Sequence, residues 1–264
     1  MAIQLGINGA AGRMGQLLVA LGHVDHELKL VAALESSGYP KLGTDAGVIA
    51  GVGPIGVPLA TQVSAPLDVI IDFSVPEAVA TVLATCLERK IALVLATTGL
   101  DAELQQRVQQ ATREIAILQA PNMSLATNLV MKLSEVAATV LKNHPSGADV
   151  EIIERHHRFK VDAPSGTALK FGQIISNVMG QTEQVHGRSG RPGQRPHREI
   201  GYHALRVGDN PGEHTIVFGL LGETVELTVR ATNRDCYAHG ALAAAKFLAG
   251  KKPGLYNMND VLGI

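Results

Sequence analysis

The sequence predicts an α/β fold in its first half and an α+β fold in its second half. Short apolar runs alternate with segments of helical spacing as far as residue 118. Such near-continuous apolar strands, separated by helices, are typical of a parallel sheet covered on both faces. After about Thr127 the pattern changes, and three late segments alternate in hydrophobicity like antiparallel or mixed strands at the surface of an open sheet.

The first half contains the elements of a parallel sheet in regular order. Strands are expected at residues 2–8, 28–34, 69–73, 92–96 and 115–118. Helices are expected at residues 12–22, 77–88 and 101–113.

The second half contains fewer and more varied elements. We expect helices at 129–141, 168–178 and 240–248, and strands at 149–154, 200–207, 213–220 and 223–231. Short turns such as 208–212 are expected to join the last three strands as antiparallel neighbours. The segment 187–196 is rich in Gly, Pro and Arg, and its pattern fits a lid, an intersubunit arm or a solvated connection equally well.

Composition excludes several classes of function. A formal net charge of −1 and 3% aromatic residues favour neither nucleic acid nor an anionic membrane as a partner. No apolar run approaches the length of a membrane span, so we expect a cytoplasmic protein. Cys86 and Cys236 are far apart and lack metal-binding spacing, which predicts free thiols in a reducing compartment.

A glycine-rich turn, Gly9–Gly15, lies between the first strand and the first helix. Glycines allow a tight turn and close approach of a pyrophosphate to the N–H groups at a helix start. Glu35 ends the second strand about twenty residues later, where a carboxylate can bind the adenosine ribose. This order predicts a Rossmann-type dinucleotide site, although a tight βα turn without a ligand would share the glycine spacing.

The residues around Glu35 bear on the choice of cofactor. A carboxylate there repels a 2′-phosphate and favours NAD, and Ser36 and Ser37 supply no cation. Lys41 and Arg13 are within reach of this position, so use of both NADH and NADPH stays open.

The densest polar chemistry lies between Glu154 and Ala168. His156, His157, Arg158 and Lys160 suit an anionic substrate that also needs a proton. The following Pro-Ser-Gly-Thr, residues 164–167, precedes a helix whose free N–H groups can bind a carboxylate.

Other interpretations of this segment are a solvated basic face, a simple N-cap at Ser165, and Ser-His nucleophilic catalysis, for which the GxSxG elbow is missing. The adjacent histidines lack a third ligand at suitable spacing, so no metal site is expected.

Over essentially its whole length the chain resembles the 4-hydroxy-tetrahydrodipicolinate reductase (dihydrodipicolinate reductase) family of lysine and diaminopimelate synthesis. The resemblance rests on these segments: 9–15, 72–74, 97–99, 120–124, 154–168, 206–208 and 212–215. The pattern His156-His157-x-x-Lys160-x-Asp162 followed by APSGTA is the most specific of them.

The resemblance implies an NAD(P)H-dependent oxidoreductase with two domains. Residues 1–126, completed by 237–264, would bind NADH and/or NADPH. Residues 127–236 would bind a cyclic dicarboxylate and form a homotetramer through their sheets. Hydride would add at ring C4 of the conjugated imine, and the resulting enamine would be protonated by His156 or Lys160.

The same resemblance implies particular site residues. Substrate carboxylates would be held by His157, Lys160, Ser165, Gly166 and Thr167. Cofactor contacts would come from Gly9, Ala10, Ala11, Gly12, Arg13, Met14, Glu35, Phe73, Ala96, Thr97, Thr98, Ala120, Pro121, Asn122 and Met123.

Two positions depart from the family pattern. Ser36 stands where an Arg often follows the acid, which weakens the expected hold on NADPH. Ala96 replaces the first Gly of Gly-Thr-Thr-Gly, and its methyl group is expected to crowd the nicotinamide side slightly.

Two rival functions share the glycine turn. A dehydrogenase of aspartate or homoserine would not need the segment 154–168. A non-catalytic NAD(H) sensor could dispense with His156 and Lys160.

Overall fold

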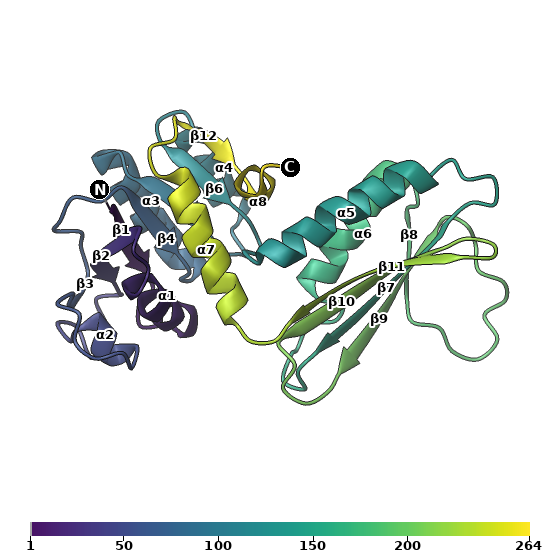
Figure 1. The fold of residues 1–264 in the computed structure, drawn as a ribbon, viewed down its shortest axis with the longest axis horizontal. Helices are drawn as coiled ribbons and strands as arrows, with labels where there is room; N and C mark the ends of the chain where they lie inside the picture. The colour runs from purple at the N-terminus through teal and green to yellow at the C-terminus, as the bar shows by residue number, and fades with distance from the viewer. Residues whose placement is uncertain (1) are drawn as a thin grey trace. The chain divides into compact units, whose positions relative to one another are not determined.

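The computed structural model describes residues 2–264, which divide into two compact units. The first unit runs to Leu125 and also contains Asp235–Ile264, and the second unit is Ala126–Arg234. Each unit has its own sheet (Figure 1). The last segment of the chain therefore folds with the first.

The first unit is built on a seven-stranded sheet in the order β12-β6-β5-β4-β1-β2-β3, and all its pairings are parallel. Its strands are β1 (Ile3–Asn8), β2 (Leu28–Leu34), β3 (Leu59–Ala60), β4 (Val69–Asp72), β5 (Ala92–Leu95), β6 (Ala116–Gln119) and β12 (Gly254–Tyr256). Every residue of β4 and β5 is buried, as expected for strands covered on both faces. The predicted parallel sheet is confirmed, while the short strands β3 and β12 were not predicted.

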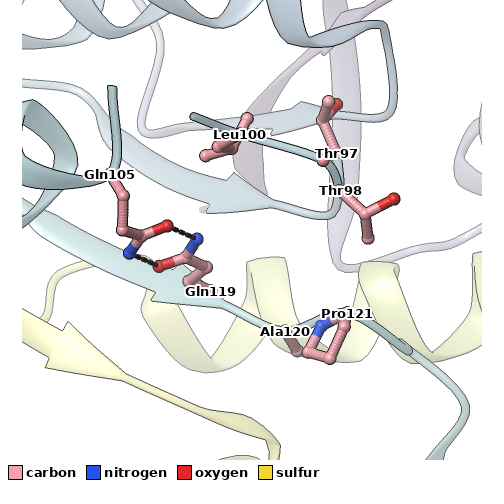
Figure 2. Close-up of a pocket in the computed structure, with 8 residues that line it drawn as sticks. Thr97, Thr98, Leu100, Gln105, Gln119, Ala120 and Pro121 are labelled. Carbon is pink, nitrogen blue, oxygen red and sulfur yellow. Dashed lines mark hydrogen bonds between the residues drawn. The ribbon is translucent and has the colours of Figure 1, made fainter. Parts of the chain in front are cut away.

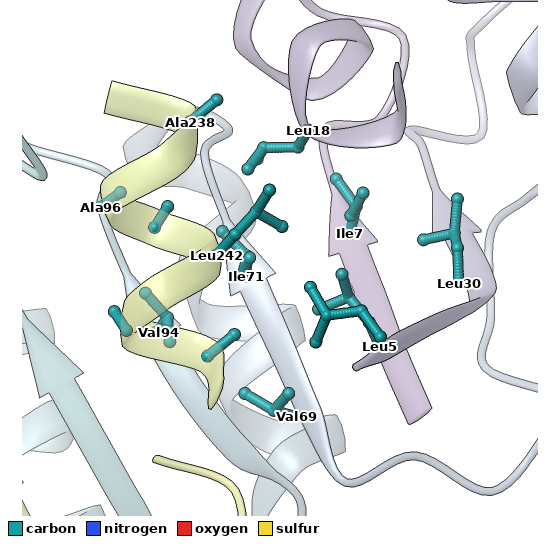
Figure 3. Close-up of a cluster of buried hydrophobic side chains, with 14 of the residues drawn as sticks. Leu5, Ile7, Leu18, Leu30, Val69, Ile71, Val94, Ala96, Ala238 and Leu242 are labelled. Carbon is teal, nitrogen blue, oxygen red and sulfur yellow. The ribbon is translucent and has the colours of Figure 1, made fainter. Parts of the chain in front are cut away.

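Helices cover both faces of this sheet. On one face, α1 (Arg13–His23) and α7 (Asp235–Leu248) pack with β1, β4 and β5, and Figure 3 shows Leu18 and Leu242 of these helices beside Ile71. On the other face, α3 (Pro76–Arg89) and α4 (Ala102–Ala111) enclose a second apolar cluster. The small helices α2 (Ala46–Ile49) and α8 (Met258–Leu262) complete the unit.

The helices of this unit begin in different ways. Asp101 caps α4 by accepting a hydrogen bond from the Leu104 N–H at 2.8 Å, and α3 has Pro76 in its first turn. In contrast, the N-cap of α1 is Gly12, which offers no side chain to the first turn. The N-terminus of α1 is therefore left for another hydrogen-bond acceptor.

The second unit contains a five-stranded mixed sheet in the order β11-β10-β7-β9-β8. Its strands are β7 (Asp149–His156), β8 (Glu183–His186), β9 (Glu199–Arg206), β10 (Gly212–Gly219) and β11 (Thr224–Ala231). The helices α5 (Leu125–Leu141) and α6 (Gly166–Met179) cover one face around the buried side chains of Phe171, Phe218 and Ile152. The predicted α+β unit with an open, mixed sheet is confirmed.

One expected pairing is wrong. β9 and β10 are not neighbours, because β7 lies between them and pairs parallel with β9 and antiparallel with β10. The turn 208–212 therefore crosses the end of β7, where the Val207 N–H donates to the His156 carbonyl at 2.9 Å. Alternating hydrophobicity predicts which face of a strand is buried, but it says nothing of which strand lies beside it.

The loop 187–196 is held against the face of this sheet that α5 and α6 leave uncovered. Arg188 donates two hydrogen bonds to Glu151, at 2.7 and 3.1 Å, and also pairs with Glu199. Arg195 pairs with Glu151 at 2.9 Å and Asp149 at 2.7 Å. The loop is thus anchored to the sheet at both ends, which is more order than a solvated connection requires.

Candidate active site

The glycine turn has the shape that a pyrophosphate needs. Gly9 has φ +77°, a conformation that favours glycine. A Cβ at Gly15 would lie 2.1 Å from the Gly9 carbonyl oxygen, so only glycine lets α1 start this close to the turn. With Gly12 as an N-cap that lacks a side chain, these residues fit a bound dinucleotide phosphate.

Glu35 lies against this turn. Its Oε1 accepts a hydrogen bond from the Ala11 N–H at 2.9 Å, and its Oε2 accepts one from the Ser36 N–H at 3.1 Å. The carboxylate predicted to bind the ribose is therefore next to the turn predicted to bind the phosphates, which agrees with a single adenosine-binding region.

A buried carboxylate joins three strand ends behind the turn. Asp72, with no exposed surface, accepts hydrogen bonds from the Asn8 amide, the Ser74 hydroxyl and the Thr97 hydroxyl, each at 2.6 Å. The Thr97 hydroxyl also accepts from the Ser74 N–H at 3.0 Å. These contacts hold the carboxyl ends of β1, β4 and β5 in one arrangement, at the sheet edge where α/β proteins bind ligands.

A pocket of about 390 Å³ opens beyond β5 and β6 (Figure 2). It is lined by Thr97, Thr98, Gly99, Leu100, Gln105, Gln119, Ala120 and Pro121. The side-chain amides of Gln105 and Gln119 exchange two hydrogen bonds of 2.9 Å at one wall. The pocket brings together four of the residues predicted to contact the cofactor, at 97, 98, 120 and 121.

Other predicted cofactor residues have buried side chains. Ala10, Ala96, Ala120 and Met123 are at most 6% exposed and pack in the core, so only their backbone is available to a ligand. The Ala96 methyl group packs into the apolar cluster of Figure 3.

The remaining predicted residues differ in exposure. Phe73, Met14 and Asn122 are partly buried, and Arg13 is exposed.

In the second unit, the polar cluster is organised by Glu154, which is 1% exposed. Both of its oxygens accept hydrogen bonds from Arg206, each at 2.8 Å. The Nδ1 of His156 lies 2.5 Å from Oε2, and the Ser165 N–H donates to Oε1 at 3.1 Å. Burial opposes ionisation, but the hydrogen bonds from Arg206 and His156 outweigh it and hold the pKa of Glu154 below its ordinary value.

His156 is tied to that carboxylate. An ionised Glu154 can only accept, so Nδ1 of His156 carries the proton and Nε2 is the atom that can exchange one. Burial lowers the pKa of His156, and the charges of Lys160 and Arg206 add to this effect, although Glu154 opposes it. Without a ligand, the imidazole is therefore neutral at pH 7.

Ser165 is the N-cap of α6, and its hydroxyl accepts from the Ala168 N–H at 3.2 Å. The same hydroxyl lies 3.1 Å from Nε2 of His214, a buried side chain whose pKa is lowered by burial to about 4. Gly166 and Thr167 are the first two residues of α6. Ser165 thus caps the helix, and the residues predicted to hold a carboxylate form one helix start.

Lys160 and His157 lie in the segment between β7 and α6. The Lys160 ammonium pairs with Asp162 at 2.8 Å. The Nδ1 of His157 is buried without a hydrogen-bond partner within residues 2–264. A buried polar atom of this kind favours an additional partner, such as a ligand carboxylate.

No role was predicted for Glu154, Arg206 or His214. Glu154 could have been found from strand parity, because it is two residues before His156 and shares its face. Arg206 and His214 come from β9 and β10, whose register with β7 only the structure shows.

Among residues 2–264, no group of three or more His, Cys, Asp or Glu side chains is placed to hold a metal ion. Within the same residues, every helix is too short or too polar to cross a bilayer. Both cysteines are free, as predicted, and burial raises the pKa of Cys86 to about 12.

The parallel sheet, the glycine turn and the acid after β2 define the first unit as a Rossmann-type dinucleotide-binding unit. Two family models cover nearly the whole chain: "Dihydrodipicolinate reductase, N-terminus" matches residues 3–123 and "Dihydrodipicolinate reductase, C-terminus" matches residues 126–262. The chain therefore belongs to the dihydrodipicolinate reductase family, whose members use NADH or NADPH.

Individual relatives agree with this assignment. A 4-hydroxy-tetrahydrodipicolinate reductase of Rhodopirellula baltica is 53% identical over 270 residues, covering 99% of this chain and 96% of the relative. Another, from Alkalilimnicola ehrlichii, is 45% identical over the full length of both chains. A dipicolinate-bound dihydrodipicolinate reductase from a Paenisporosarcina species superposes with a TM-score of 0.79 at 27% identity, covering 97% of this chain and 98% of that one.

Proposed function

We propose that this chain reduces 4-hydroxy-tetrahydrodipicolinate, by way of dihydrodipicolinate, to tetrahydrodipicolinate in lysine and diaminopimelate biosynthesis. The observation that carries the proposal is the cluster of Glu154, His156, Lys160 and Ser165. It contains the ammonium of Lys160, the titratable imidazole of His156 and the start of a helix at Ser165. Full-length matches to reductases of that name support it.

The first unit, taken as residues 1–126 with 237–264, is proposed to hold NADH or NADPH. Gly9, Gly12 and the start of α1 would bind the pyrophosphate, and Glu35 would bind the adenosine ribose. Thr97, Thr98, Ala120 and Pro121, which line the pocket of Figure 2, would hold the nicotinamide end. When bound, the cofactor supplies the hydride.

Ala10, Ala96 and Met123 have buried side chains, so their contacts with the cofactor would be made through the backbone. The other residues proposed to contact the cofactor are Ala11, Arg13, Met14, Phe73 and Asn122. Ser36 supplies no cation for a 2′-phosphate, so Glu35 favours NADH over NADPH.

The second unit, taken as residues 127–236, is proposed to hold the cyclic dicarboxylate. One carboxylate would accept hydrogen bonds from Ser165, Gly166 and Thr167 at the start of α6. Lys160 and His157 would hold the other, and the unpartnered Nδ1 of His157 supports that role.

His156 and Lys160 are the proposed proton donors. The hydrogen bond to Glu154 leaves Nε2 of His156 to deliver the proton. Two substrate carboxylates nearby would offset the charge of Lys160 and so raise the pKa of His156 toward its working range. Lys160 would act mainly by binding, since its ammonium already pairs with Asp162.

The chain is further proposed to act in the cytoplasm as a homotetramer. On the outer face of the second sheet, Ile153 and Leu205 are 40% and 37% exposed, which would suit contact with another copy. Light scattering of the purified protein is expected to give four times the monomer mass of 27.8 kDa.

The decisive experiment mixes purified protein with NADH or NADPH and freshly prepared substrate. Loss of reduced-nicotinamide absorbance is expected only when protein, cofactor and substrate are all present. Turnover with an amino acid or keto acid instead would indicate a different dehydrogenase. Tight NADH binding without turnover of any of these compounds would indicate a sensor.

A further inference from the structure

Glu154 connects three segments of the second unit: β7, β9 and the start of α6. It bonds to His156 on its own strand, to Arg206 on β9 and to the N-cap Ser165 of α6. Arg206 in turn donates to the Asp162 carbonyl at 2.6 Å, within the segment that carries Lys160. Of the residues proposed to bind or protonate the substrate, His156 and Ser165 therefore contact this carboxylate directly, and Arg206 links it to the segment of Lys160.

We propose that Glu154, kept ionised by hydrogen bonds from Arg206, His156 and the Ser165 N–H, is the positioning residue that holds His156 through Nδ1, so that Nε2 exchanges the proton beside the start of α6. The proposal rests on the proposed function. Glu154 acts through His156 and does not itself contact the substrate.

The register of the sheet explains why this position is unique. Glu154 and His156 are two residues apart on β7, so both side chains point to the face covered by α6. Arg206 lies directly opposite His156 on β9, and His214 lies directly opposite Glu154 on β10. The carboxylate of Glu154 therefore lies between the guanidinium of Arg206 and the imidazole of His156.

Four titratable or charged groups face His156. Glu154 favours the charged imidazolium, whereas Arg206 and Lys160 oppose it. His214, whose ring centroid is 5.2 Å from that of His156, is neutral because its pKa is about 4. Since Glu154 and Arg206 act on His156 with opposite sign, removing one or the other shifts its pKa in opposite directions.

The first experiment compares kcat against pH for the wild type, Glu154→Gln and Arg206→Gln. Glu154→Gln is expected to lower kcat roughly 10- to 100-fold. In the pH profile of kcat, the alkaline limb, on which activity falls as the pH rises, is expected to move to lower pH. Arg206→Gln is expected to move the same limb to higher pH. A purely structural role predicts lower stability in both variants without this opposite displacement.

Two further variants complete the series. Glu154→Asp keeps the charge and is expected to keep the limb near its wild-type position, which provides a test if Glu154→Gln does not fold. The matched control is Glu151→Gln, a carboxylate on the same strand that pairs with Arg188 and Arg195 on the opposite face. It is expected to lower Tm and leave the limb in place.

A second experiment needs no turnover. Dipicolinate is titrated calorimetrically in two buffers of different ionisation enthalpy, which measures the protons taken up on binding. The wild type is expected to take up protons as the dicarboxylate raises the pKa of His156, and Glu154→Gln is expected to take up fewer. Equal uptake in the two proteins, or pH limbs that do not move apart, would overturn the proposal.

Failure of the proposed function would give a different result: the wild type itself would not oxidise NADH or NADPH in the presence of the substrate.

Discussion

Asp72 in the first unit and Glu154 in the second are both buried carboxylates, and they are stabilised by different hydrogen-bond partners. Asp72, between the ends of the parallel strands, is surrounded by an amide and two hydroxyl groups, those of Asn8, Ser74 and Thr97. Glu154, in the mixed sheet, is surrounded by the guanidinium of Arg206 and the imidazole of His156. Both are at most 1% exposed, so both depend on these hydrogen bonds.

The two carboxylates differ in whether their hydrogen-bond partners can change charge. The donors around Asp72 do not titrate between pH 4 and 9, so they form a fixed support for the strand ends that are proposed to bind the dinucleotide. The imidazole bonded to Glu154 can gain or lose a proton in that range, which suits a group that must deliver one. In the proposed function, the first unit therefore holds the cofactor in a fixed geometry, and the second unit binds the substrate and supplies the proton.

The largest effect is expected from Lys160→Ala in the second unit. Loss of the cation is expected to lower kcat/KM for the dicarboxylate by roughly 1000-fold, since it removes both a charge partner and a candidate donor. The dissociation constant for NADH is expected to stay unchanged.

The control for this variant is Lys170→Ala, an exposed lysine on α6 that bonds only to Gln173 among the described residues. An unchanged kcat/KM in Lys160→Ala would remove this lysine from the site.

The next effect concerns stability against pH. His214 has its folded-state pKa lowered to about 4 from an ordinary value of 6.5, so the unfolded chain binds more protons between these values. Its contribution is complete above about pH 6.5 and is lost as the pH falls toward 4, a loss on the order of 3 kcal/mol.

His214→Gln is therefore expected to reduce the decrease in Tm between pH 6.5 and 4, measured by thermal unfolding. Part of the decrease is expected to remain, because the pKa of His156 is also lowered in the folded protein. The exposed His144, replaced by Gln, serves as the control. A His214 variant as acid-sensitive as the wild type would contradict the lowered pKa.

A smaller effect is expected from Asp72→Asn in the first unit. The amide presents a donor where Asn8 or Thr97 already donates, which disturbs the strand ends at a cost of about 1–3 kcal/mol. The dissociation constant for NADH is expected to rise roughly tenfold, to the same extent across pH 6–8, with dipicolinate binding unchanged.

Asp68→Asn provides the comparison, because Asp68 precedes β4 at its opposite end and bonds to the Gln4 N–H. A strong pH dependence of the Asp72 effect would break the distinction between the two carboxylates.

The smallest effect is expected from Glu35→Ser. Removing the carboxylate beside the glycine turn relieves repulsion of a 2′-phosphate by about 1 kcal/mol, so the ratio of kcat/KM for NADPH to that for NADH is expected to rise about fivefold. Glu27→Ser, before the other end of β2, is the control. An unchanged ratio would show that Glu35 does not face the ribose.

The two halves of the chain were not equally predictable. Five of the seven strands of the first sheet could be located because each is a largely apolar run. The glycine turn could be assigned because a side chain at Gly15 would clash with the backbone of the turn. In the second unit, Ser165 was correctly expected at a helix start. The neighbours of β7 were not predicted, because strand pairing over long sequence separations has no local signal.

The sequence by itself determined the parallel sheet, the position of the glycine turn and the segment that carries His156 and Lys160, since each depends on local periodicity or on residues adjacent in the chain. Only the tertiary structure brought Arg206 and His214 to Glu154 from strands 52 and 60 residues away. It likewise brought Thr97 to Asp72. A buried carboxylate needs hydrogen-bond donors, and Asp72 and Glu154 each take some of theirs from distant strands. The meeting of such distant donors is set by strand register, which is decided by packing of the whole sheet.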